Sequence, residues 1–170
     1  MCYFITLVVR GSHEASIAPV LMRHGRRADP IYDPTVQSIL KPGEAQFLTT
    51  AGHCDCGTAL LARAPDRRAK QAAKLAKKGW SPSKIERRFG DSKRADERRQ
   101  RPDSVDLWAN IVLDLFALSD VQQVGLLLRA YSRSVENEVF NAKRATVRFD
   151  DFATRLSRIR EGELLMIDRP

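Results

Sequence analysis

The pattern of hydrophobic and polar positions divides the chain into two kinds of segment. Short runs that are apolar at nearly every position are typical of strands buried on both faces of a sheet. Segments with apolar residues three or four apart are typical of helices with one buried face. The predicted strands are Cys2–Val9, Gln46–Thr50, Val121–Tyr131, Thr146–Phe149 and Glu163–Ile167. The predicted helices are Ser16–His24, Arg67–Lys78, Ser81–Gly90, Ser104–Leu118 and Asp150–Arg160.

The irregular order of these elements predicts the fold class. It favours an α/β or α+β fold, in which helices pack on a small mixed sheet. The proline-containing stretch Arg26–Gly43 is predicted to be a loop with an extended piece around Val36–Leu40. A chain of 170 residues has the size of one domain. Residues 66–101 are predicted to form a basic helical hairpin inserted into that domain.

Positive charge is concentrated in the predicted hairpin. Residues 66–101 hold 14 Lys and Arg against 5 Asp and Glu, whereas the rest of the chain holds 15 against 16. The first helix presents alanines on one face and lysines on another. The candidate partner-binding residues are Lys70, Lys74, Lys77, Lys78, Trp80, Lys84, Arg87 and Arg88.

Local signals define the turn of the hairpin. Gly79 ends the first helix, and Ser81 caps the second with Pro82 at its first position. Trp80 and Ile85 have the spacing of a hydrophobic staple. We therefore expect Trp80 to anchor the hairpin, either to the body of the protein or to a partner.

The hairpin resembles the first part of a resolvase-type helix-turn-helix. That resemblance implies a recognition helix at Ser92–Arg101, but this segment has Ala95 as its one apolar residue and cannot pack into a three-helix core. Non-specific contact with nucleic-acid phosphates remains open. Docking to an acidic protein and a merely solvated charged surface remain open as well.

Candidate metal-ligating residues cluster around Gly52–Gly57. His53, Cys54 and Cys56 lie at a predicted strand end or tight loop, and Cys2 opens the first strand. Pairing of the first two strands would bring Cys2 close to Cys54. Three thiolates and an imidazole are a ligand set for Zn²⁺. The alternatives are a redox thiol pair, although its spacing is Cys-x-Cys, and small buried cysteines with a loop histidine.

Two further enzyme classes share short motifs with the chain. An N-terminal Cys2 could act as a nucleophile, as in amidotransferases that begin Met-Cys, but the glycine-rich opening of that class is missing. Arg23-His24-Gly25 resembles the signature of the histidine phosphatases, in which the histidine accepts the phosphoryl group. That family needs a second, late histidine, and this chain has none after His53.

The opening MCYFIT, the GHCDCGT motif and the KKGWS segment together resemble those of a group of small bacterial proteins. The resemblance implies a bacterial cytoplasmic protein and no activity. The longest apolar runs are short of the roughly 18 residues that span a bilayer, so no membrane partner is expected. The sequence predicts a binding protein, regulatory or immunity-like, whose basic hairpin contacts an acidic protein or nucleic acid. The alternative is a metal- or thiol-dependent enzyme centred on the cysteines or, as a further option, a phosphatase-like enzyme using His24. The sequence assigns no cofactor beyond the hypothesis of Zn²⁺, and no oligomeric state.

Overall fold

The computed structural model describes residues 2–11, 14–60, 65–98 and 103–170, without the side chains of 65–70 and 91–98. Its strands are β1 (Cys2–Arg10), β2 (Asp29–Pro30), β3 (Glu44–Leu48), β4 (Gln123–Tyr131), β5 (Lys143–Val147) and β6 (Glu163–Asp168). Its α-helices are α1 (Glu14–Arg23), α2 (Pro34–Ile39), α3 (Pro65–Lys77), α4 (Pro82–Arg98), α5 (Val105–Phe116) and α6 (Phe152–Leu156). Short 3-10 turns cover Val135–Asn137 and Phe149–Asp151.

The strands form one six-stranded mixed sheet in the order β2-β3-β1-β4-β6-β5. Its neighbouring strands run antiparallel, except that β5 and β6 run parallel. A parallel pair needs a crossover connection, and α6 lies in it. The predicted fold class, a mixed sheet packed by helices, is confirmed. The last predicted helix, Asp150–Arg160, is shorter than expected and is reduced to α6 and the turn before it.

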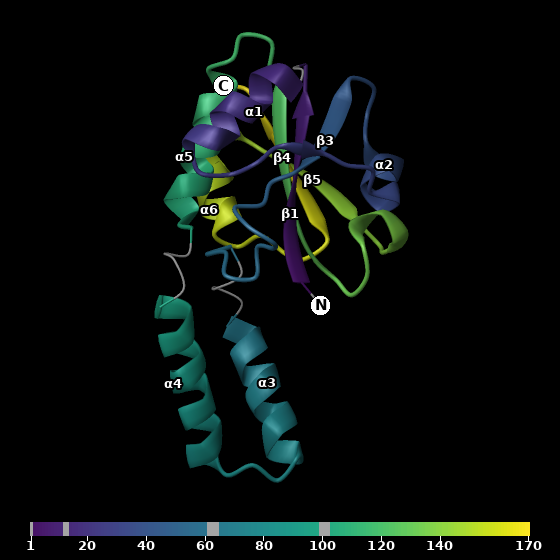
Figure 1. Cartoon of the computed structure of the whole chain (residues 1–170). Helices are drawn as coiled ribbons and strands as arrows, with labels where there is room; N and C mark the ends of the chain where they lie inside the picture. Colours follow the sequence, from purple (N-terminus) through teal and green to yellow (C-terminus); the bar gives the residue numbers. More distant parts are fainter. Residues whose placement is uncertain (1, 12–13, 61–64, 99–102) are drawn as a thin grey trace. The chain divides into compact units, whose positions relative to one another are not determined.

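Helices cover both faces of the sheet. Helices α1, α5 and α6 lie on one side and α2 lies on the other (Figure 1). On the α2 side, Val36 joins a buried cluster with Val8 of β1, Leu127 of β4 and Leu164 of β6. On the opposite side, five apolar residues of α5 are buried: Trp108, Ile111, Val112, Leu115 and Phe116. Strands β1 and β4 are therefore apolar nearly throughout, because each contributes side chains to two cores.

The predicted extended piece at Val36–Leu40 is wrong, because its residues up to Ile39 belong to helix α2 and only Leu40, which follows the helix, is extended. Asp33 caps the helix: its Oδ1 accepts hydrogen bonds from Thr35 N at 2.8 Å and Val36 N at 3.0 Å. Pro34 stands at the start of the helix, where its missing N–H costs nothing. The Tyr131 hydroxyl donates to the other Asp33 oxygen. Burial and this hydrogen bond raise the pKa of Tyr131, so the phenol keeps the proton that it donates.

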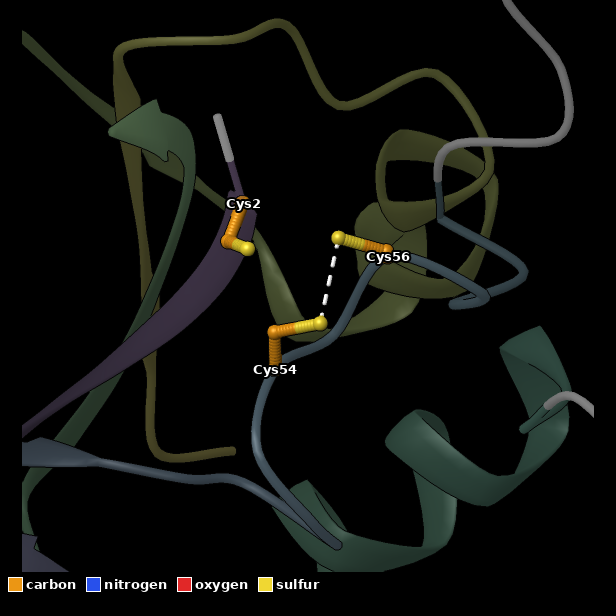
Figure 2. A group of neighbouring side chains, drawn as sticks. All are labelled: Cys2, Cys54 and Cys56. Carbon is orange, nitrogen blue, oxygen red and sulfur yellow. Dashed lines mark hydrogen bonds between the residues drawn. The ribbon is translucent and has the colours of Figure 1, made fainter. Parts of the chain in front are cut away.

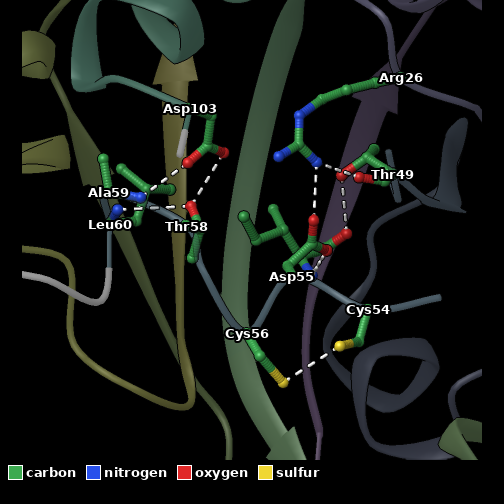
Figure 3. Close-up of polar contacts among 10 residues, drawn as sticks. Arg26, Thr49, Cys54, Asp55, Cys56, Thr58, Ala59, Leu60 and Asp103 are labelled. Carbon is green, nitrogen blue, oxygen red and sulfur yellow. Dashed lines mark hydrogen bonds and ion pairs between the residues drawn. The ribbon is translucent and has the colours of Figure 1, made fainter. Parts of the chain in front are cut away.

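The chain divides into two compact units, Met1–Cys56 with Val105–Pro170 and Gly57–Ser104. In the second unit, Asp103 joins the two ends of the segment (Figure 3). Its carboxylate accepts hydrogen bonds from Thr58 Oγ1 at 2.9 Å and Ala59 N at 2.7 Å. Among the described residues, no helix is long and apolar enough to cross a membrane.

A glycine turn separates α3 from α4, as the sequence predicts. Gly79 has φ +80°, its N–H donates to Ala76 O, and Trp80 N–H donates to Leu75 O. This pair of hydrogen bonds is a Schellman motif, which satisfies carbonyl groups at the end of α3. The α3 and α4 helices contact each other.

The predicted helix end at Gly90 is wrong, because α4 continues through Gly90 to Arg98. The separate recognition helix that the resolvase-type resemblance implies at Ser92–Arg101 is absent from the described residues, because the segment up to Arg98 is the last part of α4. Residues 99–102 lie outside the described residues. Gly90 lacks the positive φ that Gly79 adopts. The residues that follow Gly90 in the helix, 91–98, include no proline that would stop it.

Replacing each of the two glycines by alanine should have opposite effects on stability. Gly90→Ala should stabilise α4 by about 1 kcal/mol, because alanine favours a helix interior and a Cβ there meets nothing within 4 Å. Gly79→Ala should destabilise the same unit by about 1 kcal/mol, because alanine disfavours positive φ. Thermal unfolding followed by circular dichroism measures both. Destabilisation by Gly90→Ala would mean that the helix does end there.

Candidate metal centre

The candidate centre is built where β1 extends beyond its neighbour β3. Pairing between these strands ends at Thr6 opposite Leu48, so Cys2–Ile5 have no partner on β3. The loop that follows β3 supplies the hydrogen-bond partners that β3 lacks at this end of β1. Thr49 N and Thr49 Oγ1 both donate to Ile5 O, at 3.1 and 2.9 Å.

Asp55 continues the replacement of the missing strand. Its Oδ2 accepts a hydrogen bond from Ile5 N at 3.0 Å, and its own N–H donates to Tyr3 O at 2.7 Å. Cys56 Sγ accepts from Tyr3 N at 3.3 Å. A loop that carries two cysteines is thereby fixed along the edge of the strand that begins at Cys2.

Arg26 supports the loop from within the protein. Its guanidinium lies 2.8 Å from Asp55 Oδ1, and the side chains of the pair are only 4% and 1% exposed. The same nitrogen donates to Thr49 O, so Arg26 joins both ends of the loop (Figure 3). The guanidinium also lies 4.1 Å from the centre of the buried Trp108 ring.

The three thiols meet at the start of β1 (Figure 2). The sulfur atoms of Cys2, Cys54 and Cys56 all lie within 4.8 Å of one another, and those of Cys54 and Cys56 are 3.1 Å apart. Cys2 and Cys56 are exposed and Cys54 is half-buried, and all three are free thiols. The predicted approach of Cys2 to Cys54 is therefore confirmed, although the loop after β3, and not strand pairing at Cys2 itself, brings the two residues together.

His53 does not belong to the group that the structure brings together. It lies in an exposed bend before Cys54. The expected set of four ligands is thus a set of three thiols with an exposed imidazole one residue away. Three sulfur donors without oxygen donors suit soft metal ions such as Zn²⁺ or Cu⁺.

His24 is tied to a carboxylate. Its Nε2 lies 2.9 Å from Asp114 Oδ2 on α5, and Arg23 reaches the same oxygen at 3.5 Å. Arg26, from the same stretch of sequence, is buried against Asp55. Arg23 and His24 of the phosphatase-like signature thus share one carboxylate, Asp114, whereas the nearby Arg26 faces another, Asp55.

The second candidate surface lies on α3 and α4. Its described basic side chains are exposed: Lys74, Lys77, Lys78, Lys84, Arg87 and Arg88. The side chain of Lys70 lies outside the described residues. Trp80 is half-buried, with Lys84 Nζ at 4.4 Å and the Arg88 guanidinium at 5.6 Å from the ring centre. Ile85, the predicted staple partner, is buried.

Sequence reasoning missed Arg26, Asp55 and Trp108. The position of Asp55 between two cysteines was a signal that this residue belongs to the candidate site. Nothing in the sequence, however, pairs Asp55 with Arg26. Comparisons with known protein families, curated proteins and solved structures give no match to the chain. The chemistry of the site must therefore be inferred from its own residues.

Trp80 should hold the turn of the second unit together. Trp80→Ala should destabilise that unit by about 2 kcal/mol, because a half-buried tryptophan loses less than the 3–5 kcal/mol of a core one. Loss of two cation–π contacts adds to this effect. Amide hydrogen exchange in α3 and α4 measures it. The exposed Lys78→Ala is the control, and equal exchange in both variants would contradict the role of Trp80.

Proposed function

We propose that the chain binds a soft metal ion, Zn²⁺ in the first instance, through Cys2, Cys54 and Cys56. One observation carries the proposal: the three sulfur atoms lie within 4.8 Å of one another. Bonds of about 2.3 Å from each sulfur to zinc place the sulfur atoms of a tetrahedral site about 3.8 Å apart. Rotation of the side chains of Cys2 and Cys56, which are exposed, would adjust the sulfur positions to that separation.

The fourth position of a tetrahedral site is open to His53 or to water. His53 is exposed and adjacent to Cys54 in sequence, so its imidazole is the candidate for a protein ligand. With His53 bound, the site would resemble closed structural zinc sites, whereas a water there is typical of catalytic ones. A thiolate site needs reduced cysteines, which agrees with the cytoplasmic location expected from the sequence.

Removal of one thiol should abolish tight binding. Wild-type protein purified under reducing conditions should carry about one zinc per chain and lose thermal stability with a chelator. Cys56→Ser should lose most of the metal, whereas His53→Ala should lose it only if the imidazole is the fourth ligand. Elemental analysis measures the content. Wild-type protein without metal, even after exposure to Zn²⁺, would overturn the proposal.

A second function is supported by the exposed basic residues around Trp80. We propose that residues 66–101 act as the predicted basic hairpin and contact a polyanion. We favour nucleic-acid phosphates over an acidic protein as that polyanion. A row of lysines on α3 can neutralise phosphates without reading bases. Trp80 adds an aromatic ring beside two cations, and aromatic rings stack on unpaired bases.

Charge reversal tests the second function. Lys74, Lys77 and Lys78 changed together to Glu should abolish binding to a 20-base-pair DNA duplex or a single strand of that length. Arg133, Arg158 and Arg160 changed to Glu are the matched control, because these residues are exposed on the other unit. Wild-type affinity should fall with salt by about 0.7–0.9 log units per log unit for each neutralised phosphate. Binding to polyglutamate but not to DNA would favour an acidic protein, and equal loss in both variants would contradict the role of α3.

A further inference from the structure

Asp55 projects away from the two cysteines that flank it (Figure 3). Successive side chains of an extended segment alternate in direction, so the thiols face the open side while the carboxylate enters the protein. The Asp55 side chain is 1% exposed. Its carboxylate group lies between β1 on one side and Arg26 on the other.

This carboxylate connects the two segments that supply the thiols. Cys54 and Cys56 stand on the loop after β3, whereas Cys2 stands on β1. Asp55 Oδ2 accepts from Ile5 N of β1, and the neighbouring Tyr3 N donates to Cys56 Sγ. Displacement of Asp55 would therefore move two sulfur atoms relative to the third.

Arg26 makes the position of Asp55 rigid. The guanidinium contacts Asp55, the carbonyl group of Thr49 and the face of Trp108. A buried carboxylate left without its cation is strongly unfavourable, so the two side chains keep each other in place.

We infer that Asp55, held by Arg26, is a positioning residue for the metal centre and sets its affinity without touching the metal. The inference rests on the metal-binding function proposed above. Thiolates repel one another, so a site that gathers three of them before the metal arrives needs a rigid frame. Groups that orient metal ligands in this way typically contribute 10–100-fold to metal affinity.

The test compares Asp55→Asn with Glu44→Gln. Asparagine keeps the size and one acceptor of Asp55 but loses its charge. Glu44 is the matched control, because its carboxylate is also buried and bound to an arginine, Arg144 at 2.6 Å, but stands at the other end of β3 from the thiol loop. Both variants should be less stable than wild type. Only Asp55→Asn should weaken Zn²⁺ affinity, by about 10–100-fold in competition with a chromophoric chelator.

Cobalt supplies a readout that lower stability alone would not change. The thiolate-to-metal absorption of the Co²⁺ form should be weaker per bound metal in Asp55→Asn, because fewer sulfur atoms reach the ion, and unchanged in Glu44→Gln. If Asp55→Asn does not fold, Arg26→Gln removes the other partner and should give the same loss. Wild-type protein that binds neither Zn²⁺ nor Co²⁺ overturns the proposed function itself. A different result would overturn only this inference. In that case the wild-type protein binds Zn²⁺ and Co²⁺, and the Asp55 and Arg26 variants bind them with unchanged affinity and an unchanged Co²⁺ spectrum.

Discussion

Strand β1 is longer than the strand beside it, and its backbone still needs hydrogen-bond partners. Residues Thr6–Arg10 find them on β3, whereas the residues before Thr6 extend past its end. A buried N–H or carbonyl group without a partner is unfavourable by an amount comparable to a lost hydrogen bond. The loop 49–56 meets this requirement with two backbone N–H groups, a hydroxyl, a carboxylate and a thiol in place of a regular strand. The arrangement of the cysteines follows from that substitution.

The Arg26–Asp55 pair is an uncommon means of anchoring a loop. Taking two charges out of water is unfavourable, and their attraction inside the protein offsets this only with good geometry and further hydrogen bonds. Both conditions are met, since Asp55 also binds Ile5 N and Arg26 also binds Thr49 O. An apolar pair could give equal stability, but it could not accept the hydrogen bond from the strand. The ion pair therefore holds both ends of the loop through contacts that an apolar pair would lack.

The two proposed functions draw on different physics and on different units of the chain. The proposed metal centre lies in the unit that contains the sheet and depends on sulfur atoms held within a few ångströms. The basic surface lies in the unit 57–104 and depends on charge density, which tolerates variation in side-chain position. A defect in one need not affect the other, so the two proposals can be judged separately.

Short-range patterns in the sequence determined much of this protein. Continuous apolar runs predicted β1 and β4, the caps around Gly79 and Ser81 predicted the turn between α3 and α4, and Cys2 was correctly expected near Cys54. Helix α2 was missed although Asp33-Pro34 is a helix-start signal, because the surrounding prolines suggested a loop. The end of α4 was misplaced because a glycine can stop a helix or lie within one, depending on its φ. Only the tertiary structure decided that Arg26 meets Asp55 and that His53 stays outside the thiol group. These outcomes depend on contacts between residues far apart in the chain, and no local pattern encodes which distant charge fills a gap at the edge of a strand.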